Sequence, residues 1–431
     1  MNKNLMVSLA LARFPLPGKV FKSAIFSIVK KLISRVVPQA LYKPIRARIA
    51  IISYRMYCIV SKTTIKGFYP ETFTYLKQTQ HQHPTIKTYE VVEKATQGTY
   101  PGPKYLFGGD EPATYCKFHP DFFVSVIPHA TVLGMDGAVI TDNYRLLWDV
   151  SYDWPRSFGY HHEYKRRWQA PVEISGTTAV LNTFTAGNNY YHWMFNLLPR
   201  LHLVRRSSLR DEVDRFLVGS QTRSFQVDSL KLLDVSVTQI ISQDEHPIVR
   251  CERLMIPAIV DYISYNNPPP WACHFLRQSF LPHAVVPQLC AQRIFIDRSD
   301  AKNRRLLNFP EIAGVLENYG FTAIQLERYT FAEQVHLFSR AEVIIGAHGA
   351  GLTNIVFCPQ GAKVVEIFPT GAQTSFAYQQ ISAIVGLNYR YMYGNWVSED
   401  IHQRILPANA PVDFQLDPQE LSLALQELER L

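Results

Sequence analysis

The stretch that decides the fold is AEVIIGAHGAGLTNIVFCPQGAKVVEIFP, residues 341–369. A hydrophobic run ends at a glycine-rich turn that contains His348, and a second apolar segment follows the turn. The spacing predicts a strand over 341–347, a helix over 351–359 and a second strand over 362–369. A helix that begins at such a turn presents unpartnered backbone N–H groups and the positive end of its dipole, which suits a phosphate.

The segments on either side alternate in the same way between strand and helix patterns. The expected strands are 293–299, 321–326 and 388–394, and the expected helices are 308–320, 329–340 and 374–386. Thr330, with Glu333 three residues later, forms a capping box at a helix start, and Gly320 closes the preceding helix. This alternation predicts a parallel sheet with helices on both faces, which is the doubly wound arrangement of nucleotide-binding domains.

The first half of the chain shows short strands that precede a helix. Residues 129–153 are typical of strands joined by a hairpin turn at Asp142–Asn143, and 178–184 is a buried strand. The segment NNPPPW, residues 266–271, is a stiff linker because three prolines cannot lie inside a helix or a central strand. The sequence therefore predicts two α/β domains that face a cleft. The expected boundaries are a basic arm at 1–84, a first domain at 85–265, the linker, a nucleotide-binding domain at 272–405 and a C-terminal helix within 406–431.

Positive charge is concentrated at the N-terminus. Residues 1–66 hold 13 of the 44 Lys and Arg residues and no Asp or Glu, so the net charge of +8 belongs to this arm. Within it, residues 19–37 have the composition of a helix that lies on an anionic membrane, although a solvated tail or a helix packed on the body remains an alternative. No apolar run approaches the ~18 residues that cross a bilayer. Nucleic-acid binding is not expected, because the rest of the chain shows no basic face.

The six cysteines lie far apart and include no C-x-x-C pair. This spacing argues against a zinc ribbon, a redox pair or a disulfide framework, and it fits buried thiols in a reducing compartment.

Arginines near the strand 293–299 are expected to meet the charge of a phosphate. Guanidinium groups match diphosphate oxygens well, and residues at the carboxyl end of a parallel strand face the ligand. The predicted diphosphate site comprises Arg293, Arg298, Ser299, Arg304, His348, Gly349, Ala350, Gly351, Leu352 and Asn354. Two other readings remain open: the glycines permit tight packing of helix on strand, and Arg304 with Arg305 forms a solvated face.

A polar stripe marks the helix that starts at residue 190. Trp193, Leu197, Leu201 and Val204 form an apolar face, and His192, Asn196 and Arg200 lie beside it at helical spacing. A histidine at a helix start can serve as a general base because its ordinary pKa is near neutrality, although a structural role is also possible. At the end of another strand, Glu366 is expected to contact ribose hydroxyls or to be an ordinary edge carboxylate.

These segments resemble the family 61 glycosyltransferases over roughly residues 130–395. The matching residues are YYHWMFNLLPRL, IDRSDAKNRRLLN, FAEQVHLFSRAEVIIGAHGAGLTNIVFCPQGAKVVEIFP and the hairpin GAVITDNYRLLWDVS. The resemblance implies a GT-B fold, in which two Rossmann-type domains face a cleft. It also implies an inverting mechanism, a nucleotide-sugar donor that is usually UDP-linked, and no metal or other cofactor. Many bacterial relatives are associated with capsular polysaccharide biosynthesis.

The resemblance and the residues together suggest a division of roles. His192 is expected to deprotonate the acceptor, with Asn196 and Arg200 on the acceptor side, while the diphosphate site stabilises the leaving nucleotide. The family commonly has an acid where Asn196 stands, so this sequence departs from the pattern there. Eukaryotic relatives carry a membrane-spanning signal anchor, which this sequence lacks. The expectation is therefore a cytoplasmic bacterial enzyme, peripheral on the inner face of the plasma membrane through residues 19–66, with a glycan or lipid-linked glycan as acceptor.

Two other functions fit a domain of this type. One is a nucleotide-binding module without turnover. The other is a nicotinamide-dependent oxidoreductase, but that class needs the G-x-G-x-x-G fingerprint and its acidic partner, and the sequence shows neither.

Overall fold

The chain is described by a computed structural model that covers ten ranges, and the basic segment 19–66 lies outside it except for its last two residues. The ranges are 65–79, 88–108, 114–151, 168–183, 186–260, 267–299, 301, 304–370, 377–396 and 413–430. Residues 65–79, which the sequence assigned to the arm, are folded. There β1 (Gly67–Tyr69) pairs in parallel with β7 (Arg145–Leu147), and α4 (Thr72–Thr79) follows.

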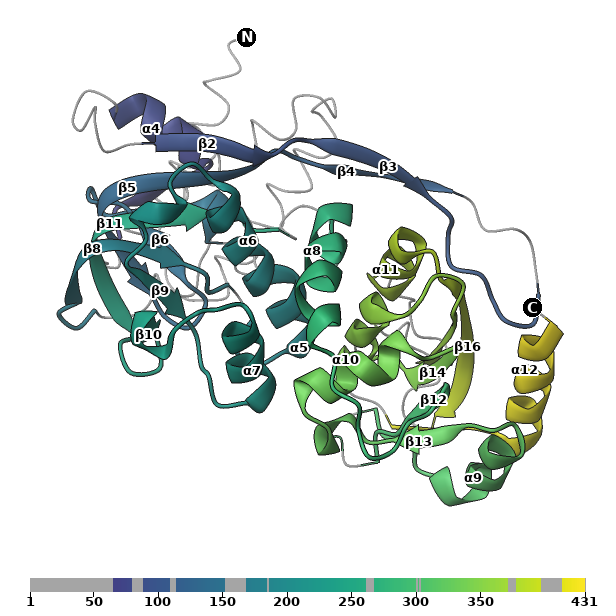
Figure 1. The fold of residues 1–431 in the computed structure, drawn as a ribbon. Helices are drawn as coiled ribbons and strands as arrows, with labels where there is room; N and C mark the ends of the chain where they lie inside the picture. The colour runs from purple at the N-terminus through teal and green to yellow at the C-terminus, as the bar shows by residue number, and fades with distance from the viewer. Residues whose placement is uncertain are drawn as a thin grey trace, which may run out of the picture. The chain divides into compact units, whose positions relative to one another are not determined.

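The first sheet is mixed and belongs to the N-terminal half (Figure 1). Its order is β1-β7-β6-β5-β11-β8-β9-β10, and β2 also pairs with β5. The remaining strands are β2 (Thr88–Glu93), β5 (Phe122–Leu133), β6 (Ala138–Ile140), β8 (Val172–Val180), β9 (Arg215–Val218), β10 (Ile240–Ser242) and β11 (Ile248–Pro257). From β11 to β10 the neighbours are parallel, whereas β11 and β5 are antiparallel.

The predicted hairpin is confirmed at its turn, and one central strand was missed. β6 and β7 are joined across a turn in which the N–H of Tyr144 donates to the carbonyl of Thr141 at 2.9 Å. The missed strand is β11, which lies between β5 and β8. Its middle carries Arg250, Glu252 and Arg253 next to a bulge, so its sequence lacks a buried alternating pattern.

The second sheet has the order β13-β12-β14-β15-β16-β17. Its strands are β12 (Arg293–Ile296), β13 (Thr322–Ile324), β14 (Val343–Ala347), β15 (Lys363–Pro369), β16 (Asn388–Trp396) and β17 (Phe414–Gln415). All neighbours are parallel except β17, which runs antiparallel to β16. The predicted helices are present as α9 (Phe309–Asn318), α10 (Phe331–Ser339), α11 (Ala377–Val385) and α12 (Pro418–Arg430), and the Thr330–Glu333 capping box is formed.

Two predicted helices differ from expectation. The segment after the glycine turn is a 3₁₀-helix, Ala350–Phe357, which we call η8. The helix from residue 190 consists of α5 (Tyr190–His192), a π-helical turn over Trp193–Leu197 and α6 (Leu198–Arg206). Pro199 explains the wide turn, because proline has no N–H to donate to the carbonyl four residues earlier.

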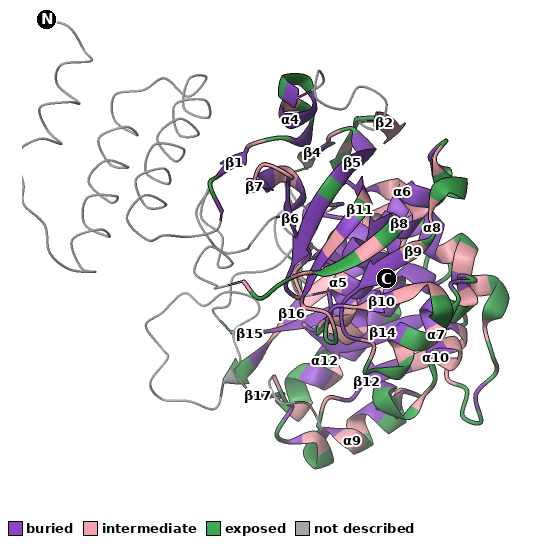
Figure 2. Ribbon diagram, turned by 90° about the vertical axis from the view of Figure 1, so that its left-hand side faces the viewer, coloured by how far each residue is buried: buried purple, intermediate pink, exposed green. Residues whose placement is uncertain are grey.

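Apolar residues from both sheets form one continuous core (Figure 2). It joins Trp193 and Leu254 of the first half to Ile344 and Val364 of the second, and α8 (Pro270–Phe280) packs against α6, η8 and α11. The last of the three predicted linker prolines, Pro270, is the first residue of α8. A second cluster lies under α9 and α12 on the other face of the second sheet.

A two-stranded ribbon links the two halves. β3 (Thr96–Tyr100) and β4 (Tyr115–His119) form the ribbon, which follows β2 in the chain and extends toward α11 in Figure 1. The hydroxyl of Tyr115 donates to the side chain of Gln380 in α11 at 3.0 Å. We call the described part of residues 96–119 the strap.

Candidate functional site

The order of the second sheet defines where a ligand would bind. From β12 the chain passes through α9 to β13 on one side, and then through α10 to β14 on the other side of β12. Such a reversal is a topological switch point, and ligands of open α/β sheets bind outside the carboxyl ends of the strands at this point. The residues that follow β12 and β14 are therefore the candidates for ligand contact: Asp297 to Ser299, and His348 to Gly351.

Gly349 explains why glycine flanks the histidine of the turn. A Cβ at this position would lie 2.5 Å from Nη1 of Arg298, so the guanidinium group rests against the Gly349 backbone. The carbonyl of Gly349 accepts hydrogen bonds from the buried Tyr378 hydroxyl at 2.7 Å and from the Leu352 N–H at 3.0 Å. This contact brings Arg298 and the glycine turn together, and Tyr378 is a neighbour of the turn that sequence reasoning missed.

The other two glycines serve packing. A Cβ at Gly346 would lie 3.1 Å from Ile296, and one at Gly351 would lie 2.8 Å from Leu326. Leu352 is buried in the core, while Ala350 is partly exposed beside it. Gly346 and Gly351 thus permit tight packing of the helical segment on the strand. Close approach to a ligand is a proposal for Gly349 alone.

Arg304 interacts electrostatically with Arg298. Burial lowers the pKa of Arg304, and the charge of Arg298 lowers that pKa further, so the two guanidinium groups are close enough to repel each other. Burial also lowers the pKa of Arg298. Arg304 has a φ of 56°, a left-handed conformation that is uncommon for a residue with a side chain. Two positive charges held in a poorly solvated position favour an anion between them.

His348 is oriented by a buried carboxylate. Its Nδ1 donates to Glu366, whose other carboxylate oxygen accepts from the Tyr389 hydroxyl at 2.6 Å. Glu366 is fully buried, whereas the side chain of His348 is 12% exposed and stacks on Phe368 with ring centroids 5.3 Å apart. The predicted contact of Glu366 with a ribose gains no support, because both of its oxygens are engaged inside the protein. Among the residues that the structure describes, Nε2 of His348 has no hydrogen-bond partner, so this atom can meet a ligand.

Ser299 and Arg293 have structural partners. The hydroxyl and the N–H of Ser299 both donate to Asp297 at 2.9 Å, and Gln325 also donates to Asp297 at 2.8 Å. These bonds fix the turn from which Arg298 projects. Arg293 begins β12 at its amino end, pairs with Glu429 and lies over the ring of Phe321 at 4.7 Å. Arg293 is therefore at the edge of the sheet opposite Arg298 and does not join the predicted diphosphate site.

The helix start that carries His192 lies against the glycine turn. Asn189 is the N-cap of α5, and the Tyr190 hydroxyl donates to the side chain of Asn354 in η8 at 2.5 Å. The ring of Tyr191 lies 6.0 Å from that of Tyr378. Asn354 is fully buried and also donates to Gln334, so it joins the two halves rather than facing a ligand.

His192 and Asn196 meet as predicted, but Arg200 does not. The ring Nδ1 of His192 lies 3.2 Å from Oδ1 of Asn196, and burial lowers the pKa of His192, so the neutral ring is favoured. With Asn196 as acceptor, Nδ1 carries the proton and Nε2 keeps a lone pair.

Arg200 is completely buried. It donates to the carbonyl oxygens of Pro257, at 2.7 and 3.1 Å, and of Asn182, and burial lowers its pKa to about 9. The assignment of Arg200 to the acceptor side is therefore replaced by a structural one, because the extra residue in the π turn rotates it into the first sheet.

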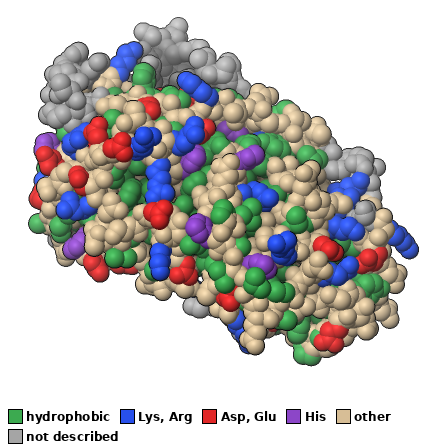
Figure 3. All heavy atoms as spheres, in the orientation of Figure 1, with side chains coloured by type: hydrophobic (Ala, Val, Ile, Leu, Met, Phe, Trp, Pro, Cys, Tyr) green, Lys and Arg blue, Asp and Glu red, His purple; other side chains and the backbone are tan. Residues whose placement is uncertain are grey.

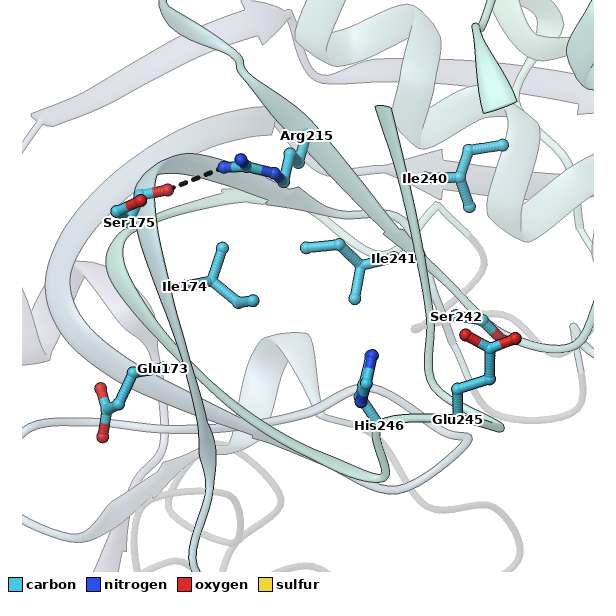
Figure 4. A pocket seen from close by; sticks show the side chains of 9 residues that line it. All are labelled: Glu173, Ile174, Ser175, Arg215, Ile240, Ile241, Ser242, Glu245 and His246. Carbon is cyan, nitrogen blue, oxygen red and sulfur yellow. Dashed lines mark hydrogen bonds between the residues drawn. The ribbon is translucent and has the colours of Figure 1, made fainter. Parts of the chain in front are cut away.

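One pocket lies away from this site (Figure 4). Its volume is about 240 Å³, and it is lined by Glu173, Ile174, Ser175, Arg215, Ile240, Ile241, Ser242, Glu245 and His246, all in the first half. Arg215 donates to the Ser175 carbonyl at 3.0 Å, and Glu173 pairs with Arg250 at 3.2 Å. Glu173 is thus paired locally, and no strand end of the second sheet contributes to the pocket.

Three further observations concern partners. On the face shown in Figure 3, acidic and basic side chains are interspersed. No three His, Cys, Asp or Glu side chains of the described residues cluster as a metal site would require. Among the helices that the structure describes, none combines the length and apolarity needed to span a membrane.

The sequence comparisons match part of the chain to a family model and to several relatives. The Glycosyltransferase 61 family model matches residues 190–365, which run from α5 to β15. The mouse protein O-linked-mannose beta-1,4-N-acetylglucosaminyltransferase 2 is 32% identical over 257 residues, which are 53% of this chain and 44% of that protein. Alpha-1,3-arabinosyltransferase XAT2 of rice (Oryza sativa subsp. japonica) is 25% identical over 263 residues, or 55% of this chain and 43% of that protein.

A third relative is the EGF domain-specific O-linked N-acetylglucosamine transferase of Drosophila melanogaster. It is 25% identical over 252 residues, which are 53% of this chain and 47% of that protein. This chain thus spans less than half the length of each of these relatives. The matched family confirms the resemblance that the glycine turn and the α5 segment suggested.

Proposed function

We propose that this chain, whose residues 190–365 match the Glycosyltransferase 61 family model, transfers a sugar from a nucleotide donor onto a glycan acceptor. The observation that carries the proposal is the contact of Arg298 with the Gly349 backbone at the switch point of the second sheet. The proposal includes a UDP-linked donor, an inverting and metal-independent reaction, and a GT-B arrangement of the two halves. Its biological setting would be capsular or other surface polysaccharide biosynthesis in a bacterium.

The donor diphosphate would bind between the two arginines and the glycine turn. Arg298 and Arg304 supply positive charge, and backbone N–H groups at the start of η8 supply directed dipoles. His348, which Glu366 orients, completes the set. These groups stabilise the negative charge that develops when the nucleotide leaves, which is the role a divalent cation plays in other transferases.

His192 is the proposed general base. Its neutral ring is favoured by burial, and Asn196 holds Nδ1 so that Nε2 has a free lone pair. The contacts of Tyr190 and Tyr191 with Asn354 and Tyr378 place this helix start beside the glycine turn. A base on one half and an anion site on the other are the two groups that a single displacement needs.

The proposed reaction is a single displacement at the anomeric carbon. The acceptor hydroxyl oxygen attacks this carbon from the face opposite the diphosphate, and its proton passes to Nε2 of His192. The bond from the anomeric carbon to the diphosphate oxygen breaks, and its electron pair remains on the nucleoside diphosphate between Arg298 and Arg304. One displacement inverts the anomeric configuration.

The relatives narrow the chemistry of the substrates but do not name them. Two are N-acetylglucosaminyltransferases and one is an arabinosyltransferase by name. We extend to this chain only the class, a sugar nucleotide and a glycan or lipid-linked glycan. We further propose a cytoplasmic enzyme, held at the inner face of the membrane by the basic segment 19–66.

Titration with UDP tests the anion site, with Arg298→Ala as the probe and Arg305→Ala as the control. Arg305 follows Arg304 but is exposed and pairs with Asp413 at 2.7 Å. Loss of a hydrogen-bonded charge costs about 1.5–3 kcal/mol, so Arg298→Ala should weaken UDP binding about 10- to 150-fold. Arg305→Ala should leave the affinity within about twofold. Equal effects of the two substitutions would refute the site.

A nucleotide-binding module without turnover remains the rival reading. It predicts that UDP binds at the same place but that neither transfer nor hydrolysis occurs with any sugar nucleotide. Thermal shift with UDP-, GDP- and dTDP-sugars selects the donor, because a ligand of the native state raises the melting temperature. Release of nucleoside diphosphate from that donor then separates an enzyme from a module.

A further inference from the structure

A row of aromatic rings leads away from the switch point across the carboxyl end of the second sheet. It starts at His348, which stacks on Phe368 at 5.3 Å, and Phe368 lies 6.2 Å from Tyr391. Tyr391 lies 5.6 Å from Tyr393 in the same strand. Because β14, β15 and β16 are parallel neighbours, the row runs from the anion site toward the edge of the sheet.

The strap adds two rings to the end of this row. Tyr105 forms a parallel bridge with Tyr391, and two backbone hydrogen bonds of 2.9 and 3.0 Å join Tyr391 to the strap. The ring of Tyr105 lies 5.4 Å from that of Tyr391 and 6.0 Å from that of Tyr393. Phe107 follows at 5.6 Å from Tyr105. The strap thus extends the sheet by one short segment and places its aromatic residues beside β16.

We call Tyr105, Phe107, Tyr391 and Tyr393 the aromatic platform. Its three tyrosines are half-buried and Phe107 is 43% exposed, whereas Phe368, which links the platform to His348, is fully buried. Contiguous aromatic surface of this kind is uncommon on a protein unless it contacts a partner. A half-buried tyrosine offers an apolar ring face together with a hydroxyl that can bond to a polar ligand.

We propose that the aromatic platform binds the acceptor glycan by stacking of its sugar rings. The inference rests on the proposed function, since it assigns a place to the second substrate of the same reaction. A pyranose ring has an apolar C–H face and a rim of hydroxyls, which matches the two kinds of surface that the tyrosines present. The position also fits, because the row begins at the His348 turn where the transferred sugar would leave its nucleotide.

The extent of the platform distinguishes a glycan from the nucleobase of the donor. A nucleobase is one flat ring system and is covered by one or two aromatic side chains. In the platform, Tyr105, Tyr391 and Tyr393 form a triangle with centroid distances of 5.4, 5.6 and 6.0 Å, and Phe107 lies 5.6 Å from Tyr105. A cluster of four rings offers contact to more than one ring of a ligand, and an oligosaccharide chain is a ligand in which rings repeat.

Glycan binding by the full chain, measured without a donor, tests the proposal. The probes are chito-, manno- and xylo-oligosaccharides of one to six sugars. Their binding is measured by saturation-transfer NMR and by calorimetry. Phe107→Ala removes the most exposed ring of the platform, and Phe118→Ala is the matched control because Phe118 is a 56% exposed residue of β4 in the same strap. We expect the longest bound probe to bind about 5- to 10-fold more weakly to Phe107→Ala and unchanged to Phe118→Ala.

UDP affinity is the second readout and separates the possible failures. Phe107→Ala should bind UDP as the wild type does, and a parallel loss of UDP affinity would overturn the proposal in favour of a nucleobase site. Absence of glycan binding to the wild type, or equal losses in the two variants, would also overturn it. Glycan binding through the platform by a protein that does not bind UDP would instead refute the proposed function and leave the platform in place.

Discussion

Substitution of Gly349 by alanine tests the link between the glycine turn and the anion site. The backbone of Gly349 is extended, with a φ of 170°, so alanine can adopt it without strain. The new Cβ would lie 2.5 Å from Nη1 and 2.9 Å from Cζ of Arg298. Since non-bonded heavy atoms settle at about 3.5 Å, the guanidinium group must withdraw by about 1 Å.

A displacement of this size should reduce activity far more than stability. A 1 Å misplacement of a positioning group can cost about 100-fold in rate, which corresponds to about 3 kcal/mol of transition-state stabilisation. The guanidinium group is the far end of a flexible side chain, so the fold can accommodate its movement. We expect Gly349→Ala to lower kcat/KM about 100-fold with the selected donor and to change the melting temperature little, as measured by steady-state kinetics and calorimetry.

Two other glycines provide controls for this experiment. Gly314 in α9 has open space where a Cβ would lie, so Gly314→Ala should keep full activity and gain stability from helix propensity. Gly351→Ala would place a Cβ 2.8 Å from the buried Leu326 and should destabilise the fold by about 1–3 kcal/mol through overpacking. If Gly349→Ala retains the activity of Gly314→Ala, or if it loses stability as Gly351→Ala does, the reasoning about Arg298 is wrong.

Three further predictions concern the base, a buried acid and metal dependence. His192→Ala should lower turnover about 100-fold or more and leave UDP affinity unchanged. The control His246→Ala, in the distant pocket, should retain turnover. Normal turnover in His192→Ala would mean that another residue is the base. Burial raises the pKa of Asp149 to about 7 despite two hydrogen bonds from Thr72, so the folded state holds its proton more tightly than the unfolded chain does. Stability should therefore fall as the pH rises from about 4 to 7, by at most about 1.4 kcal/mol per pH unit, and denaturant titrations of Asp149→Asn should lack this slope. A chelator should leave transfer intact, and loss of activity that Mg²⁺ or Mn²⁺ restores would contradict the proposed metal independence.

Much of the second sheet could be predicted from the sequence because each of its elements has a simple period. The strands β12, β13, β14 and β15 are short apolar runs, and the helices between them carry caps such as Thr330. The alternation of the two patterns implied parallel strands, and the parallel arrangement implied that Arg298 and His348 would lie at one edge. Local pattern was sufficient there because successive strands along the chain from β12 to β16 are separated only by short helical segments.

The remainder depended on contacts that a linear pattern does not contain. Arg200 seemed polar at helical spacing with His192, but Pro199 widens the helix by one residue and turns Arg200 inward. Pro199 is visible in the sequence and was a usable signal for that change. The bonds of Tyr378 to Gly349 and of Tyr190 to Asn354 had no such signal, because a tyrosine in a sequence looks the same whether it only packs or also bonds to a residue far away in the chain.

The site also shows why the free protein favours an anionic ligand. Burial lowers the pKa of Arg298 and of Arg304, which means that folding makes their charged forms less stable than they are in the unfolded chain. Both remain charged at neutral pH, so this cost is fully present below their folded pKa values and reduces the stability of the unliganded protein. A diphosphate that bonds to both groups removes part of that cost, and binding is correspondingly stronger. Glu366 is fully buried and engaged by His348 and Tyr389, so the approaching diphosphate does not face an exposed carboxylate. The arrangement thus sacrifices some stability of the empty site for a position where negative charge is favoured before the substrate arrives.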